Sequence, residues 1–269
     1  MSTLEIYTSQ GKRIGDESGR SNGRIEDFFF DGVRLYLDTG RDPELTVFFR
    51  ARESEAGRAE QYYAVYQTDT STSLFERFER DLRQEVEEAQ EMILETGSED
   101  AQLVSMLTED ITVPGTDDQH GAISSILAER KPLRLQVPTE KAAFGLLRQY
   151  IASPAEQFAI GDDTDTESMS DCDLAIEPGA EDGMEPLGDS VDLFEEQLRR
   201  TTANAARPRA SRADPEASEP VDDRLESIGR EVAAVAVGVA LGVGVLVALL
   251  NGAAVIGLEV PGIEWLIFV

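Results

Sequence analysis

The chain has 269 residues, a formal net charge of −29 and a sequence pI of about 4.2. So acidic a sequence offers no basic surface interleaved with aromatic residues, which excludes direct nucleic-acid binding as the expected function. Cys172 is the only cysteine, so an intramolecular disulfide and a zinc site made of several cysteines are excluded as well.

The first 70 residues predict an antiparallel β-meander of four or five strands. Asp31-Gly32 is a two-residue turn between two apolar runs, which indicates a hairpin. In the second run, apolar residues alternate with polar or amphipathic ones, so one face of that strand should be buried. The expected strands cover residues 4–8, 24–30, 33–38, 44–52 and 61–68.

A long helix is predicted after the meander. Ser73 and Glu76 have the spacing of a capping box, and Gly97 marks the expected end. Apolar residues between them recur at helical spacing, so the helix should cover one face of the meander and give an α+β core. A helix that pairs with a coiled-coil partner is the alternative.

The sequence from Ser98 to residue 200 predicts mostly helices, with strands at residues 132–137 and 174–179 and a solvated acidic loop at residues 161–173. The helices are expected from Ser98 to Leu107, from Asp117 or Asp118 to Arg130, from a cap at Thr139 through Ile151, and from Ser190 to Arg200. We expect residues 1–198 to form one acidic cytoplasmic α+β domain, or two closely packed subdomains of about residues 1–97 and 98–198.

Few residues suggest a reaction centre or a metal site. In the acidic loop, Asp163, Asp165, Asp171 and Asp173 are candidate ligands for a hard cation, because such ions bind several oxygens. The loop lacks the glycine and the glutamate of a calcium-binding loop. His120 is the only histidine and no Gly-x-Ser-x-Gly elbow is present, so we expect no catalytic residue and no cofactor.

The composition resembles that of proteins from extremely halophilic archaea. Only three lysines accompany 21 arginines, against 53 acidic residues. In molar salt the Debye length falls to about 3 Å, so neighbouring carboxylates are screened from one another. The acidity is then an adaptation to the solvent, and we expect the soluble portion to lose structure at low salt.

Residues 231–258 predict a transmembrane anchor. From Val232 to Leu250 the chain holds only Val, Ala, Gly and Leu, and at about 1.5 Å per residue this stretch spans a hydrocarbon layer of roughly 30 Å. Gly238 and Gly242 repeat at a spacing that lets helices approach closely, so the anchors can self-associate. Trp265, in a short apolar tail of residues 259–269, suits the membrane interface. A helical hairpin with both ends cytoplasmic is the alternative to a single span.

Residues 199–230 predict a flexible linker rich in Arg, Ala and Pro. The linker carries seven arginines against six acidic residues, whereas no lysine or arginine follows the expected span. Because positive charge marks the cytoplasmic side, the N-terminal domain should face the cytoplasm. The first ten residues also lack the apolar run of a secretory signal.

These features predict a non-enzymatic interaction or sensory protein that is anchored to the cell membrane. Its expected partners are the lipid bilayer and another protein. One alternative is a membrane-acting effector that oligomerises through its transmembrane segment. The other is an anchored hydrolase without a recognisable motif.

Overall fold

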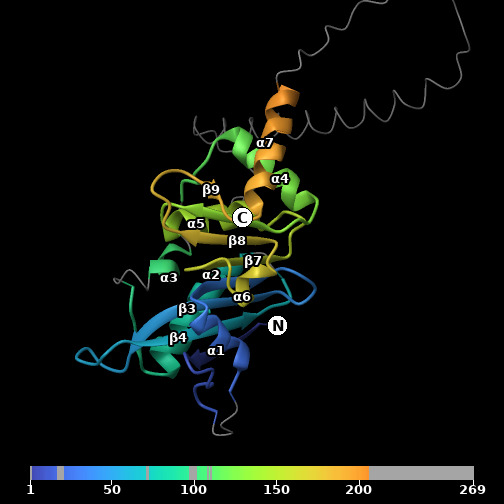
Figure 1. The fold of residues 1–269 in the computed structure, drawn as a ribbon. Coiled ribbons are helices and arrows are strands. Elements are labelled where there is room, and N and C mark those ends of the chain that lie inside the picture. Colours follow the sequence, from blue (N-terminus) through green and yellow to red (C-terminus); the bar gives the residue numbers. More distant parts are fainter. Residues whose placement is uncertain are drawn as a thin grey trace, which may run out of the picture. The chain divides into compact units, whose positions relative to one another are not determined.

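The computed structural model describes residues 2–16, 21–70, 73–96, 102–107, 109 and 111–205 (Figure 1). These residues belong to one compact unit. The expected linker beyond residue 205, the anchor and the tail lie outside the described residues, and so do Val232, Gly238, Gly242, Leu250 and Trp265. Within the described ranges, no helix has the length and apolarity needed to cross a bilayer.

A nine-stranded mixed sheet runs through the described residues (Figure 1). The short strand β5 (Ile93–Leu94) pairs with the end of β3. The other strands follow the order β1 (Thr3–Thr8), β4 (Glu60–Gln67), β3 (Glu44–Arg52), β2 (Val33–Asp38), β7 (Gln157–Gly161), β8 (Leu174–Pro178), β6 (Leu133–Val137) and β9 (Glu185–Pro186).

The predicted α+β class is confirmed, but the prediction of a purely antiparallel meander is wrong. Strands β1, β4, β3 and β2 are antiparallel neighbours, as expected. However, β2 also pairs with β7, and β7, β8 and β6 run parallel to one another. Parallel neighbours need a crossover connection, and here α5 (Glu140–Tyr150) and α6 (Glu167–Ser170) lie in the two crossovers.

Residues 24–30, the first arm of the expected hairpin, form a helix instead. Helix α1 (Gly23–Phe30) buries Ile25 and Phe28, which lie three residues apart and therefore on one helix face. Gly32 has a φ of +68°, and its N–H donates to the carbonyl oxygen of Phe29 (3.4 Å). The Asp31-Gly32 pair thus ends a helix, where a left-handed glycine is favoured, and does not join two strands.

The long predicted helix is shorter than expected and ends in a π-helical turn. Helix α2 (Leu74–Arg83) continues into η1 (Gln84–Ala89). Ser73 has a left-handed φ of 49° and its side chain makes no capping hydrogen bond, so the predicted capping box with Glu76 is wrong. Gly97, the expected end of the helix, lies outside the described residues.

The apolar spacing accounts for the π turn. Leu74, Phe78, Leu82 and Val86 are buried and follow one another at intervals of four residues. In an α-helix each such step exceeds a full turn by about 40°, so the apolar row drifts away from the sheet. A π turn holds more residues and returns Val86 to the core. Its wider hydrogen bond joins the Gln90 N–H to the Glu85 carbonyl oxygen (3.0 Å).

Several predictions for the C-terminal half are confirmed. β6 and β8 form where strands were expected, and α7 (Ser190–Ala205) covers the last predicted helix and extends beyond it. The Thr139 hydroxyl caps α5 by accepting from the Ala142 N–H (3.1 Å). Helix α3 (Gln102–Met106) lies within the next predicted helix, whose expected cap, Ser98, is outside the described residues.

Other predictions for this half are corrected. Helix α4 (Asp117–Ala128) is capped by Thr116 and not by Asp117 or Asp118, because the Thr116 side chain and Gln119 form a capping box. Strand β7 was not predicted. Residues 161–173 are not simply a solvated loop, since they include α6 and bury Met169 and Cys172.

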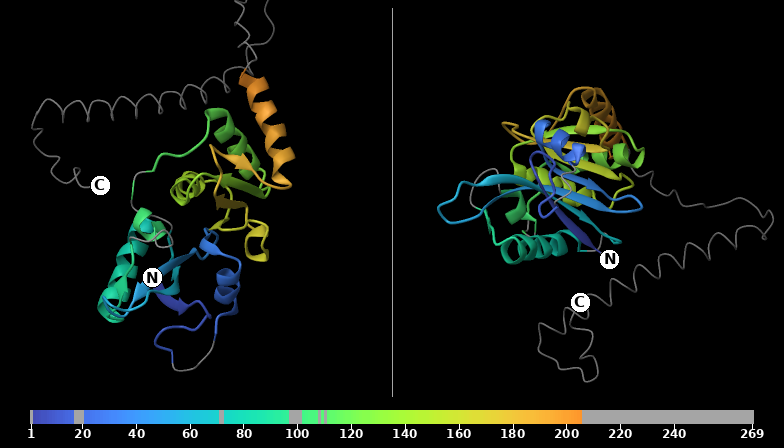
Figure 2. Two further views of the ribbon diagram at one scale, coloured as in Figure 1. Left: turned by 60° about the vertical axis from the view of Figure 1, so that its left-hand side comes forward. Right: turned by 90° about the horizontal axis from the view of Figure 1, so that it is seen from below.

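Helices lie on both faces of the sheet (Figure 2), and apolar side chains pack beneath them in two cores. The larger core takes side chains from α2, α3, α4 and α5, and the smaller one takes them from α1 and α6. Phe75 of α2 and Phe144 of α5 meet edge to face with ring centroids 5.0 Å apart. The sheet and the larger core therefore both include residues from either side of residue 97.

Candidate functional site

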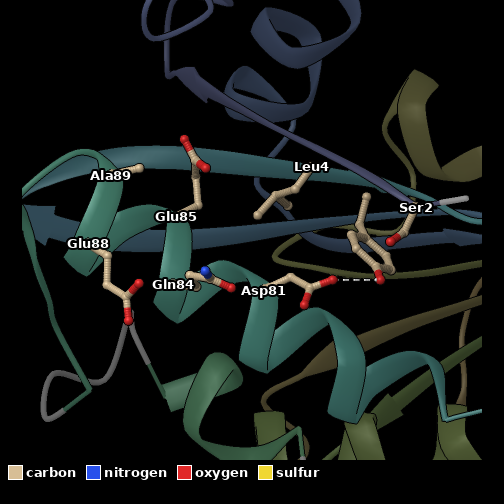
Figure 3. Close-up of a pocket in the computed structure, with 8 residues that line it drawn as sticks. Ser2, Leu4, Asp81, Gln84, Glu85, Glu88 and Ala89 are labelled. Carbon is tan, nitrogen blue, oxygen red and sulfur yellow. Dashed lines mark hydrogen bonds between the residues drawn. The ribbon is translucent and has the colours of Figure 1, made fainter.

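A groove of about 400 Å³ runs between the edge strand β1 and the helix formed by α2 and η1 (Figure 3). Leu4 of β1 and Ser2 just before it contribute an apolar and a hydroxyl side chain, and the helix contributes three acids, one amide and an alanine. The lining residues are Ser2, Leu4, Tyr66, Asp81, Gln84, Glu85, Glu88 and Ala89.

The inner wall of the groove is built from two paired strand residues. Leu4 of β1 and Tyr66 of β4 are register partners, and both pack against the core beneath α2. The Tyr66 ring meets Phe78 of α2 edge to face, with ring centroids 5.8 Å apart. The Tyr66 hydroxyl donates to Asp81 Oδ2 (3.0 Å), as the dashed line in Figure 3 shows. Sheet and helix are thus held at a fixed separation along this wall.

The opposite wall is formed by the π turn. Val86 is fully buried, and this leaves Gln84, Glu85, Glu88 and Ala89 of η1 to face solvent or the groove. Turns of this kind are rare in proteins and often occur at functional sites, because the inserted residue changes which side chains a helix presents. Here the turn lies beside the strand edge.

The groove is negatively charged, and none of its lining residues is basic. Asp81 is already occupied, because its Oδ1 accepts from the Arg80 guanidinium (2.9 Å) and its Oδ2 from Tyr66. Glu85 Oε1 accepts from the Gln90 amide (2.9 Å). Among the described residues, no lysine or arginine forms an ion pair with Glu85 or Glu88.

Part of the outer edge of β1 is unpaired within the described chain. The Ile6 carbonyl accepts from the Ile14 N–H (2.8 Å), and the Thr8 N–H donates to the Lys12 carbonyl (2.8 Å). Backbone groups of alternate residues point to the same edge, so those of Leu4 point outward as well. None of the described residues bonds to them there.

The four candidate cation ligands are found near β7 and β8. Asp163 Oδ1 accepts from the Asp165 N–H (2.8 Å), and Asp165 forms an ion pair with Arg134. These bonds stabilise the loop after β7, in which Asp162 also pairs with Arg34 (3.1 Å).

The other two candidates lie at the end of α6. Asp171 is the C-cap residue of that helix, and Asp173 Oδ2 accepts from the backbone N–H of Glu156 (2.7 Å). In the part of the chain that the structure describes, no three acidic, histidine or cysteine side chains are grouped to hold a metal ion. Asp163, Asp165 and Asp173 therefore each make a contact within the fold, and Asp171 follows the last residue of α6.

His120 joins two helices. Its Nδ1 lies 2.9 Å from the hydroxyl of Tyr150, which connects α4 to α5. Burial raises the pKa of Tyr150 to about 12. The neutral phenol is therefore stable beside the imidazole at physiological pH.

Cys172 is enclosed in the smaller core. Burial, and then the nearby carboxylates of Asp173 and Asp171, raise the pKa of its thiol to about 12. Because the thiolate is the reactive form, this thiol is a poor nucleophile at neutral pH.

Sequence reasoning did not single out the groove residues. Leu4 and Ile6 alternate with polar residues, which predicts a half-buried strand but not its place at the sheet edge. Glu85 and Glu88 look like solvent-facing residues of a long helix. A row of apolar residues spaced strictly by four is the one signal that points to the π turn.

Comparisons with protein-family models, with curated proteins and with solved structures find no match for the chain. The case for a function therefore depends on the chemistry of the groove.

Proposed function

We propose that the chain is a membrane-anchored interaction protein whose cytoplasmic domain binds a protein partner in the groove between β1 and the α2–η1 helix. The observation that supports this proposal is the position of the groove along an open strand edge. A strand edge beside a helix is a known docking geometry, because the edge supplies backbone hydrogen bonds and the helix supplies contacts for side chains.

The groove is suited to binding because its walls are packed on the core and joined by a hydrogen bond. Tyr66, Phe78 and Leu82 are buried beneath it, and the hydrogen bond from Tyr66 to Asp81 connects the walls. A partner that binds a preformed groove loses little free energy to ordering the surface it meets. The polar groups that it meets are already in place.

Residues 231–258 anchor the domain to the membrane in this proposal. Their length and apolar composition suit a helix that spans the bilayer, and this would hold the domain beside the inner leaflet. The acidic surface of the domain is adapted to a cytoplasm of high salt, in which its carboxylates are screened. Location and binding then belong to separate parts of the chain.

The docking test uses one substitution at two places. Ala89→Trp puts a large ring into the groove from an exposed position, and Ala56→Trp makes the same change in the exposed loop between β3 and β4. The full chain is cross-linked in native membranes at high salt, and captured proteins are identified. We expect the wild type and Ala56→Trp to retain the same partner and Ala89→Trp to lose it. Equal recovery with both variants would contradict the groove as the docking face.

The role of the anchor is tested by deleting residues 231–269. An interaction protein should then leave the membrane fraction and keep its partner in solution. A membrane-acting effector, the alternative that the Gly238 and Gly242 spacing favours, should lose its effect on the bilayer altogether. A full-length chain that stays in the supernatant after high-speed centrifugation in brine would remove the membrane part of the proposal.

A further inference from the structure

We infer that the groove binds an extended basic segment of the partner, which adds to the edge of β1 as a strand and places lysine or arginine side chains against Glu85 and Glu88. This inference rests on the proposed function, because it names the chemistry of the segment that docks. Its three parts are the backbone of β1, the charge of η1 and the alternation of the incoming side chains.

The backbone part follows from where β1 is already paired. Residues 12–14 cover the outer edge beside Ile6 and Thr8. The chain then turns, and the Asp16 N–H donates to the Arg13 carbonyl oxygen (3.4 Å). The outward N–H and C=O of Leu4 lie just beyond this covered stretch, beside the groove. An extended segment can pair with them and continue the line that residues 12–14 begin.

Some other glutamates on helices of the domain are paired with an arginine, and this contrast supports the charge part of the inference. Glu79 pairs with Arg83 (3.0 Å) and Glu195 with Arg199 (2.8 Å), each one helical turn away. Glu85 and Glu88 line the groove one turn apart, and no base of the described chain forms an ion pair with them. In molar salt only charges in direct contact, about 3 Å apart or less, still attract one another strongly, and a basic side chain of the partner can reach such contact with these carboxylates.

The alternation of side chains along a strand determines which residue types the docked segment needs at successive positions. Successive side chains of a strand point to opposite faces, so every second side chain faces the helix wall and the remaining ones face away from it. Leu4 and Ala89 give the groove an apolar part, and the two glutamates lie along η1 (Figure 3). Backbone pairing supplies the affinity of such a complex, and the acids select among segments.

A second copy of this chain fits the groove less well. Its β1 edge would bring another Glu85 and Glu88 to the same place, so these carboxylates would meet further acids and no basic side chain. An extended acidic segment has the same disadvantage. The partner's charge therefore distinguishes the three occupants.

The test measures binding of defined peptides to the full chain in detergent micelles and molar potassium chloride. Three labelled peptides of about seven residues are compared: alternating valine and arginine, alternating valine and glutamate, and the arginine peptide N-methylated along its backbone. Fluorescence anisotropy gives the affinities, and hydrogen exchange reports on the amide of Leu4. The arginine peptide should bind and slow that exchange, and the other two should bind at least about tenfold more weakly.

Matched variants locate the binding. The double substitution Glu85→Gln with Glu88→Gln should lower the affinity for the arginine peptide about three- to tenfold, as expected for the loss of two partly exposed charge pairs. The control, Glu181→Gln with Asp182→Asn, removes two exposed carboxylates outside the groove and should leave the affinity unchanged. Neither pair removes a core contact.

Several results would overturn the inference. Equal binding of the glutamate peptide would contradict selection by Glu85 and Glu88. Equal binding of the N-methylated peptide would contradict backbone pairing with β1. Absence of binding, or a Leu4 amide protected without peptide in a dimer of the chain, would replace the basic segment with another occupant. If Ala89→Trp blocks the natural partner while the peptides fail, only this inference falls. If Ala89→Trp has no effect, the proposed function falls with it.

Discussion

Phe144→Ala tests whether the two halves of the domain fold together. The Phe144 side chain is fully buried in α5 and meets Phe75 of α2 at 5.0 Å between ring centroids. Truncation of a buried phenylalanine to alanine costs about 3–5 kcal/mol, of which the aromatic pair accounts for about 0.5–1.5 kcal/mol. This is a large fraction of the roughly 5–15 kcal/mol that stabilises a domain of this kind.

Hydrogen exchange at high salt is the suitable assay, because it reports each strand separately. Amides of β4, in the N-terminal half, and of β8, in the C-terminal half, should exchange faster by the same factor, about two to three and a half orders of magnitude. Phe30→Ala is the matched control, since Phe30 is 75% exposed and its loss should change stability by no more than about 0.5 kcal/mol. Faster exchange in β8 with β4 unchanged would show that the halves unfold separately and would refute the argument.

The packing and the charge of the domain lead to four further predictions. Cys172 should react with iodoacetamide at pH 8 only after denaturation, and rapid alkylation of the folded chain would contradict its burial. The pKa of the Cys172 thiol is about 12 in the folded chain, against an ordinary value of 9.0. Unfolding therefore releases the thiol proton above pH 9, and the free energy of unfolding falls as the pH rises there. Denaturant titrations should show a smaller fall in this free energy between pH 9 and 10 for Cys172→Ala than for the wild type. Gly32→Ala should destabilise by about 1 kcal/mol or more, because φ is +68° and a Cβ would lie 3.0 Å from Asp162. Gly23→Ala, with no atom near its Cβ, should be neutral or stabilising by denaturant titration, and the reverse order would refute the assigned backbone. Circular dichroism of the chain should show loss of structure on dilution from molar to millimolar salt, and an unchanged spectrum would argue against the halophilic interpretation.

Local patterns predicted much of the sheet, and they failed where one pattern serves two structures. The alternating residues of β2, β3 and β4 identified three neighbouring strands. Asp31-Gly32 fits both a hairpin turn and the end of a helix, since glycine with a positive φ suits either. Only the spacing of Ile25 and Phe28 distinguishes them, and it places both side chains on one side of a short helix.

The topology of the C-terminal half lies beyond local patterns. β7 is a five-residue strand with only three apolar side chains in a row, Phe158, Ala159 and Ile160, and periodicity cannot separate so short a run from a buried helix segment. Its pairing with β2 depends on contacts between residues far apart in the chain. The groove was missed for the same reason, because Leu4 and Glu85 become neighbours only when β1 takes the edge of the sheet beneath η1.

The pairing of β2 with β7 sets a delay during protein synthesis. Leu37 of β2 pairs with Phe158, so about 120 residues must be translated before the partner strand exists, which takes roughly 6–24 s. Throughout that interval the exposed backbone of β2 can accept residues 157–161 of a neighbouring nascent chain. Ribosomes crowded on one message would therefore favour strand-exchanged dimers, and slow initiation would favour the monomeric fold.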